Sequence, residues 1–176
     1  MHKQKQAGFT IVELLIVVVV IAILAAITIV SYAGIRDRAM DTRRATDLNS
    51  LRNAVMIWSG EKNLTIDVSG TGFGGNGNGW VTNSSYPKSL ENLLIEQGYL
   101  SSPIRDPVTP TGVGSYMVYK CSAPASSGQD RTFGLFARMA NPDQPGNDKA
   151  EWDALGCVSG GANSTYGMNY IKMFVL

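Results

Sequence analysis

The feature that most constrains this chain is an apolar run near its N-terminus. The 17 residues from Leu14 to Val30 contain one polar side chain, Thr28. With the apolar-rich stretch that begins at Phe9, the run reaches the length of about 20 residues that an α-helix needs to cross a bilayer. One carboxylate, Glu13, lies within it. Because an ionised side chain at the centre of a membrane-spanning helix costs roughly 2.5–3.5 kcal/mol, Glu13 is a candidate functional residue.

Basic residues precede the apolar run and predict its orientation. His2, Lys3 and Lys5 form a short flank of the kind that stays in the cytoplasm, so we expect the C-terminal bulk to lie outside. One alternative is a secretory signal peptide with a small-residue cleavage site at Ala25–Ala26, although such peptides have a shorter apolar region of about 7–15 residues. A second alternative is a plain signal anchor, which explains the topology and leaves Glu13 unexplained.

The basic leader, the pair Gly8-Phe9, the acid Glu13 and the apolar helix together resemble the prepilin signature of type IV pilins and type II secretion pseudopilins. The resemblance extends from Gly8 to Tyr32. It implies that prepilin peptidase cuts between Gly8 and Phe9 and that Phe9 is then N-methylated. It also implies that Glu13 pairs with the Phe9 amine of a neighbouring subunit. Such a pair in a low-dielectric core sets register more than it adds net stability.

The resemblance implies a structural subunit of a type IV pilus-like extracellular filament and not an enzyme. The precursor would wait in the cytoplasmic (inner) membrane as a single-pass protein and then enter a filament at the cell surface. The implied partners are prepilin peptidase, the pilus assembly platform with its ATPase, and further copies of the chain in a helical filament. Two alternatives remain open, a pseudopilin of a type II secretion or DNA-uptake system and an adhesin displayed at a filament tip.

Composition supports a structural role. Cleavage after Gly8 would remove Lys3 and Lys5, which leaves 13 basic residues against 14 acidic ones and a net charge of −1. That balance indicates no specific nucleic-acid partner. Cleavage would also remove His2, the only histidine, and with it the Ser-His and Cys-His arrangements and the histidine-containing zinc sites. We expect no cofactor.

The helical pattern continues past the apolar run. Because the chain has no proline before Pro87, we expect one helix from Phe9 to about Gly60, roughly 80 Å long. Its second half is amphipathic, with apolar residues in a 3-4-3 spacing at Leu48, Leu51, Val55 and Trp58. Charged residues are expected on a solvated face, with the pairs Arg38–Asp41, Asp41–Arg44 and Arg43–Asp47.

Alternating apolar residues predict an antiparallel sheet after this helix. The expected strands are Ser115–Cys121, Arg131–Met139, Met168–Val175 and a short fourth strand near Leu155–Val158. Residues 69–85, rich in glycine and asparagine, are expected to be a loop. Ser89 is expected to cap a short helix that ends near Gly98. The predicted fold class is α+β, with a long N-terminal helix packed on a small head that contains an antiparallel sheet. This is the lollipop-shaped fold that the resemblance to pilins implies.

These observations predict a division of the chain into five segments. The segments are a leader (1–8), a transmembrane or filament-core helix half (9–30), an amphipathic helix half (31–61), a glycine-rich loop with a short helix (62–114), and a sheet with a disulfide-bounded C-terminal region (115–176).

Two cysteines and four acids complete the list of candidate sites. An even cysteine count in an exported chain favours a disulfide between Cys121 and Cys157, as in the C-terminal region of type IV pilins, and two free buried thiols are the alternative.

Four acidic residues close together in the sequence could supply oxygen ligands and make a weak candidate for a calcium site. They lack EF-hand spacing, and a solvated acidic loop is the alternative. These ligands are Asp143, Asp148, Glu151 and Asp153.

Overall fold

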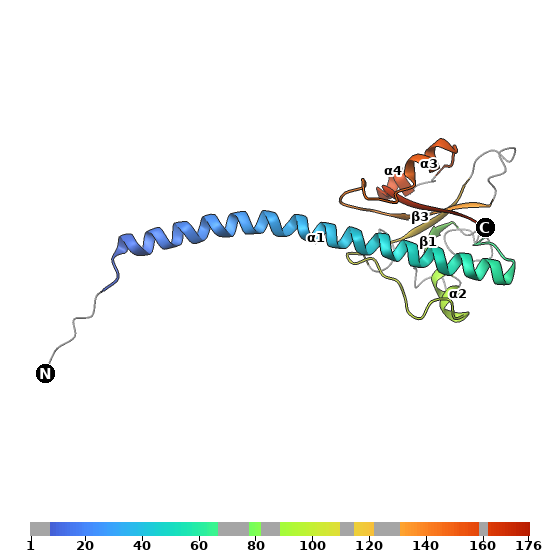
Figure 1. The fold of residues 1–176 in the computed structure, drawn as a ribbon, viewed down its shortest axis with the longest axis horizontal. Coiled ribbons are helices and arrows are strands. Elements are labelled where there is room, and N and C mark those ends of the chain that lie inside the picture. The colour runs from blue at the N-terminus through green and yellow to red at the C-terminus, as the bar shows by residue number, and fades with distance from the viewer. Residues whose placement is uncertain (1–7, 67–77, 82–88, 110–114, 122–130, 159–161) are drawn as a thin grey trace. The chain divides into compact units, whose positions relative to one another are not determined.

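The structure is a computed structural model (Figure 1). Its fold is α+β. The structure describes residues 8–66, 78–81, 89–109, 115–121, 131–158 and 162–176. The chain divides into two compact units, one that ends at Arg38 and one from Ala39 to Leu176, which we name the head. Each unit is described by itself below.

Helix α1 runs from Ile11 to Lys62 and confirms the long helix expected from the sequence. No proline interrupts it, and the apolar positions change from all faces to one face along its length. Within the head, the predicted 3-4-3 positions form its buried stripe. Leu48, Leu51, Val55 and Trp58 are all fully buried.

Four antiparallel strands form one sheet in the order β1-β2-β3-β4. Their bounds are β1 Gly79–Trp80, β2 Met117–Lys120, β3 Thr132–Ala137 and β4 Tyr170–Val175. The alternation predicted for β3 is confirmed, since Phe133 and Leu135 lie in the core shared with α1 while Phe136 lies in a second core on the opposite face. The sheet is therefore buried on both faces.

The head has three layers (Figure 1). On one face of the sheet lie the head portion of α1 and the short helix α2, Leu90–Glu96. On the other face lie α3, Lys149–Ala154, and α4, Ala162–Tyr166. Trp152 of α3 is fully buried and packs edge-to-face on Phe136, with ring centroids 5.4 Å apart. This second core holds α3 and α4 against the sheet.

Helix α2 has the ends that the sequence predicts. Ser89 is the N-cap, and its side chain accepts a hydrogen bond from the backbone N–H of Asn92. Gly98, at φ +81°, follows the last turn in the left-handed conformation that glycine adopts readily.

The fourth strand is not where the sequence placed it. Residues 155–158 form no strand, because the backbone N–H groups of Leu155 and Gly156 bond back to carbonyls of α3 and make a turn. The fourth strand is β1 instead, inside the stretch 69–85 that was expected to be all loop. The remainder of that stretch, 69–77 and 82–85, lies outside the described residues. A two-residue strand has no periodicity to detect, and Gly79–Trp80 is a strand only because β2 pairs with it.

Candidate assembly and processing segment

The predicted cleavage bond, Gly8–Phe9, lies before the first turn of α1. Residues 8–10 are exposed and have no regular secondary structure, and the helix begins at Ile11. A Cβ added to Gly8 would meet no atom within 4 Å. The described part of the chain therefore places no steric demand for glycine at this position, and any such demand comes from a partner that binds the segment.

Thr10 and Glu13 cap the N-terminus of α1 reciprocally. Glu13 Oε2 accepts hydrogen bonds from the backbone N–H of Thr10 (2.9 Å) and from its hydroxyl (2.8 Å). The backbone N–H of Glu13 in turn donates to Thr10 Oγ1 (3.2 Å). This is a capping box, and a carboxylate is also favourable near the positive end of the helix dipole. Thr-x-x-Glu before an apolar run is the sequence signature of this cap, which is not among the predictions made from the sequence above.

The capping box leaves half of the carboxylate available. Both bonds from Thr10 go to Oε2, and Oε1 has no partner among the described residues. The cap also holds the side chain at the start of the helix, four residues from Phe9 along the chain. Glu13 can therefore accept a hydrogen bond or an ion pair from outside without losing its own cap.

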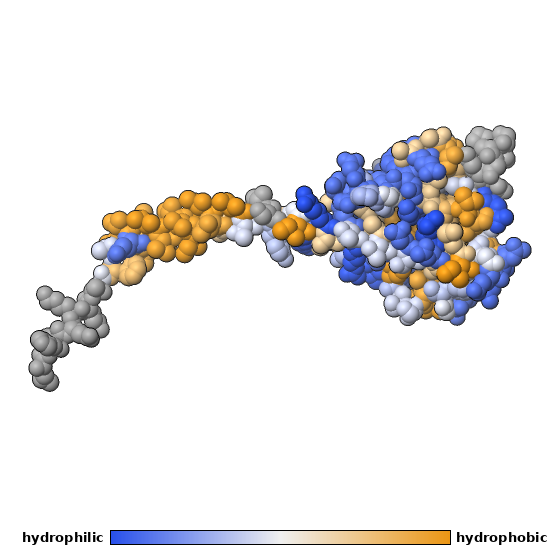
Figure 2. Space-filling model, viewed as in Figure 1, coloured by the Kyte–Doolittle hydropathy of each residue, from blue (hydrophilic) through white to orange (hydrophobic). Residues whose placement is uncertain are grey.

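The residues that follow expose their side chains on every face. We name residues 9–29 the stem. Its large apolar side chains are exposed by between 48% and 85%, and Figure 2 shows an almost continuous hydrophobic surface there. The hydroxyl of Thr28 donates to the backbone carbonyl of Leu24, so this polar group is satisfied within the helix. By length and composition, α1 is the one described helix that could cross a membrane. A surface of this kind requires lipid or protein around it.

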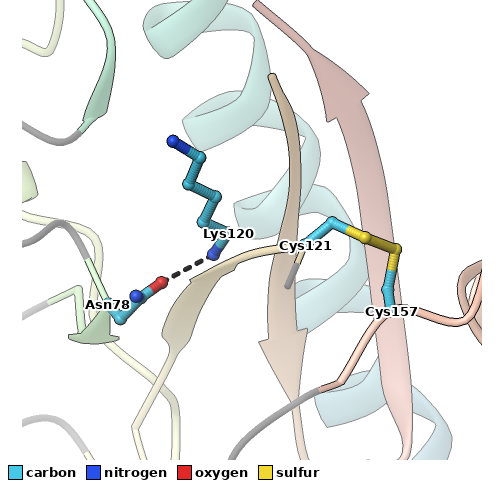
Figure 3. The surroundings of a disulfide bond; sticks show 4 residues. All are labelled: Asn78, Lys120, Cys121 and Cys157. Carbon is cyan, nitrogen blue, oxygen red and sulfur yellow. Dashed lines mark hydrogen bonds between the residues drawn. A yellow bond between two sulfur atoms is a disulfide. The ribbon is translucent and has the colours of Figure 1, made fainter. Parts of the chain in front are cut away.

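The disulfide predicted between Cys121 and Cys157 is present (Figure 3). Cys121 directly follows β2, Cys157 follows the turn after α3, and both are nearly fully buried. Next to the bond, the backbone N–H of Lys120 donates to Asn78 Oδ1 (2.6 Å), which extends the pairing of the β1 segment with β2. The disulfide ties the α3 layer to the end of the sheet.

The four acids of the weak calcium candidate do not gather around one point in the described structure. Asp148 pairs with Lys172 (3.4 Å) and Asp153 with Lys149 (2.5 Å). No group of three or more histidine, cysteine, aspartate or glutamate side chains in the described ranges is arranged to hold a metal ion.

Charged residues of α1 that were expected to lie on a solvated face form a buried cluster. Asp41 is fully buried and accepts hydrogen bonds from the backbone N–H groups of Ala140 (3.0 Å) and Asn141 (2.8 Å). Arg44 pairs with Asp41 (3.3 Å) and with Asp106 (2.7 Å). The expected Asp41–Arg44 pair is thus present but buried, because its partners come from loops far along the chain.

Neighbouring groups in this cluster have shifted pKa values. Burial alone would raise the pKa of Asp106, but hydrogen bonds from Arg44 and from two backbone N–H groups outweigh it and hold this pKa below its ordinary value. Burial raises the pKa of Asp47 despite its hydrogen bond from the Tyr116 hydroxyl (2.7 Å). Burial, followed by this bond to Asp47, raises the pKa of Tyr116.

A long, exposed apolar N-terminal helix followed by a small disulfide-bonded α+β head is the architecture of pilin-like proteins. Residues 3–29 match the family model described as the prokaryotic N-terminal methylation motif. The chain is 30% identical over 135 residues to the type IV major fimbrial protein FimA of Dichelobacter nodosus, which covers 75% of this chain and 73% of FimA. The chain belongs to the type IV pilin and type II secretion pseudopilin family, whose members are structural proteins and not enzymes.

A second relative represents the secretion branch of this family. The chain is 30% identical over 63 residues to the type II secretion system core protein G of Aeromonas hydrophila. That similarity covers 36% of this chain and 44% of the relative, less than half of its length. No solved structure matches the chain significantly.

Proposed function

We propose that this protein is a structural subunit of a type IV pilus-like extracellular filament. The observation that carries the proposal is the stem, whose large apolar side chains are at least 48% exposed and have to be covered by something outside the chain. In a filament, stems of neighbouring copies would cover one another. The similarity to a major fimbrial protein over 75% of the chain supports a fimbrial role.

Processing would create a positively charged partner for Glu13. Prepilin peptidase would cut the exposed Gly8–Phe9 bond and leave an amine on Phe9, which would then be N-methylated. Glu13 Oε1 has no partner in the described part of the chain, which supports a pair with the Phe9 amine of a neighbouring copy, because the capping box keeps this carboxylate in place. In a core free of water either charge would be costly alone, so the pair would set the axial register of the subunits.

The same stem would hold the precursor in the cytoplasmic membrane before assembly. Its length and composition suit a single pass, with the head outside. The assembly platform and its ATPase would then move the subunit from the membrane into the filament at the cell surface.

A second candidate function is a pseudopilin of a type II secretion or DNA-uptake system. The similarity to core protein G favours it, over a shorter part of the chain than the similarity to FimA. The two candidates share the stem, the cleavage site and the role of Glu13. They differ in where the finished assembly is found.

The test is mass spectrometry of the N-terminal peptide in filaments sheared from cells. N-methylated Phe9 in the sheared fraction is the expected result, since it requires both processing and surface assembly. The same peptide confined to the cell envelope would favour the pseudopilin. An intact leader, or a cut near Ala26, would overturn the proposal and return the chain to a plain anchor or a secreted domain.

A further inference from the structure

Among the strands that the structure describes, β4 pairs with β3 alone, so it is an edge of the sheet. The backbone N–H of Leu176 donates to the carbonyl of Arg131, so every second residue counted back from Leu176 faces β3. The residues between them, Ile171, Met173 and Val175, direct their N–H and C=O groups away from the sheet. A row of such groups is a template on which a strand of another chain can pair.

Groups from outside the sheet occupy this row. The N–H of Ile171 donates to Asn147 Oδ1 (3.0 Å), and its carbonyl accepts from the N–H of Asp148 (2.8 Å). The N–H of Met173 donates to Asp148 Oδ2 (2.8 Å), and its carbonyl accepts from Arg52 Nε (3.2 Å). All four outward groups of these two residues are therefore satisfied without a further strand.

The side chain of Asp148 is committed to this edge and not to its own helix. Asp148 is the N-cap residue of α3, yet its side chain makes no capping hydrogen bond. Asn147 Oδ1 instead accepts from the N–H of Lys149 (3.1 Å). An aspartate at an N-cap normally bonds the first turn, so its use on β4 indicates a separate role for this carboxylate.

We propose that Asn147, Asp148 and Arg52 close the β4 edge against strand addition by a second copy of this chain. Val175 is the one outward residue of β4 whose backbone groups have no partner among the described residues, and one residue is too short to hold a second strand. Removing the caps would leave Ile171, Met173 and Val175 as a continuous open row. The partner that fits such a row is the same row on another copy, paired antiparallel about a two-fold axis.

Such a pair would compete with growth of a filament. A two-fold contact uses the same surface on both copies and is complete with two, whereas a filament grows by one repeated contact between different surfaces. This consequence rests on the proposed function. The closed edge itself is a property of the head and is tested without filaments.

The test uses the full chain in detergent micelles and the variant Asp148→Ala. We measure hydrogen exchange at single backbone amides and the sedimenting mass over a range of protein concentrations. At low concentration the Met173 amide is expected to exchange roughly tenfold faster or more than in the unsubstituted protein, since its charged acceptor is lost. As the concentration rises, the mass is expected to double and the Met173 amide to become protected again.

The matched control is Asp153→Ala, which removes a carboxylate of the same helix that is also paired with a lysine. It is expected to leave the Met173 amide and the mass unchanged. Association through stems would raise the mass of every variant equally and leave the exchange of Met173 unaltered, so it would not imitate the expected result.

A second variant keeps the test decisive if Asp148→Ala does not fold. Arg52→Ala opens the carbonyl of Met173 and leaves the α3 layer intact, and it is expected to self-associate in the same way but more weakly. A folded Asp148→Ala or Arg52→Ala variant that stays monomeric at every concentration would overturn the proposal. Concentration-dependent protection of Met173 in the unsubstituted chain would overturn it as well.

Discussion

Gly134 of β3 lies directly against Trp152 of α3. A Cβ on Gly134 would come within 2.9 Å of Trp152 Cζ3, within 2.9 Å of Phe136 Cε2 and within 3.1 Å of Ile171 Cγ2. Real Cβ atoms essentially never come as close to another atom as the two 2.9 Å contacts with the aromatic rings, and both rings are fully buried and packed edge-to-face. The absence of a side chain at Gly134 is what lets the α3 layer lie close to the sheet.

Gly134→Ala is therefore expected to destabilise the head by about 1–3 kcal/mol, the usual cost of overpacking a core. Thermal unfolding of the full chain in detergent measures the effect. The matched control is Gly60→Ala on the exposed side of α1, where a Cβ meets nothing within 4 Å and alanine is the better helix former. An unchanged melting temperature in Gly134→Ala would show that the α3 layer is not held this closely.

Glu13 has a capping role and a charge role that two substitutions separate. Glu13→Gln keeps an oxygen for the capping box and removes the charge, whereas Thr10→Val removes the hydroxyl of the cap and keeps the charge. We expect Glu13→Gln to insert into the membrane normally and to lose most of the sheared filament yield, because no ion pair to Phe9 forms. Thr10→Val is expected to fray the start of α1, seen as faster amide exchange there, and to lower the yield less. A normal yield from Glu13→Gln would contradict the charge role.

Gly8→Ser is expected to block processing without disturbing the described fold. Added atoms at Gly8 have open space around them, so the effect would arise in the peptidase site. The measurement is the apparent size of the protein in membranes, with the unsubstituted chain as the processed control. A mature-size product from Gly8→Ser would place the cleavage site elsewhere.

Asp106 and Asp47 are expected to respond to acid with opposite signs. The pKa of Asp106 is held below its ordinary value, so its charge stabilises the head above about pH 4, and this stability is lost as the pH falls through the folded pKa. The pKa of Asp47 is raised, so its charge costs stability at neutral pH and the cost disappears on acidification.

Two amide variants measure these contributions. Asp106→Asn is expected to lower the free energy of unfolding by about 1.5–3 kcal/mol at neutral pH and to flatten its fall below about pH 4. Asp47→Asn keeps an acceptor for the Tyr116 hydroxyl and is expected to be neutral or stabilising. Denaturant titrations at neutral and acid pH decide between these outcomes, and equal losses in the two variants at neutral pH would contradict the assignment.

Much of the fold is predictable because its signals are local. The apolar run and the 3-4-3 spacing predict α1, alternation predicts β2, β3 and β4, and Ser89 with Gly98 predicts the ends of α2. The capping box of Thr10 and Glu13 is equally local and could have been predicted from its spacing. Strand β1 could not, since two residues show no pattern until another strand pairs with them.

Contacts between distant residues account for the rest. In the sequence, Asp41 on α1 is one of several charges on a helix surface. It is buried because its hydrogen-bond donors are the backbone N–H groups of Ala140 and Asn141, which lie about 100 positions further along the chain. The caps on β4 likewise join Arg52 to a carbonyl 121 residues away. The spacing of side chains along the chain is enough to decide that α1 forms and that its first part is apolar on every face. Which charged groups are buried, and which strand edge is closed, depends on loops and helices that meet only in the folded head, because a buried charge is tolerable only where partners from elsewhere in the chain satisfy it.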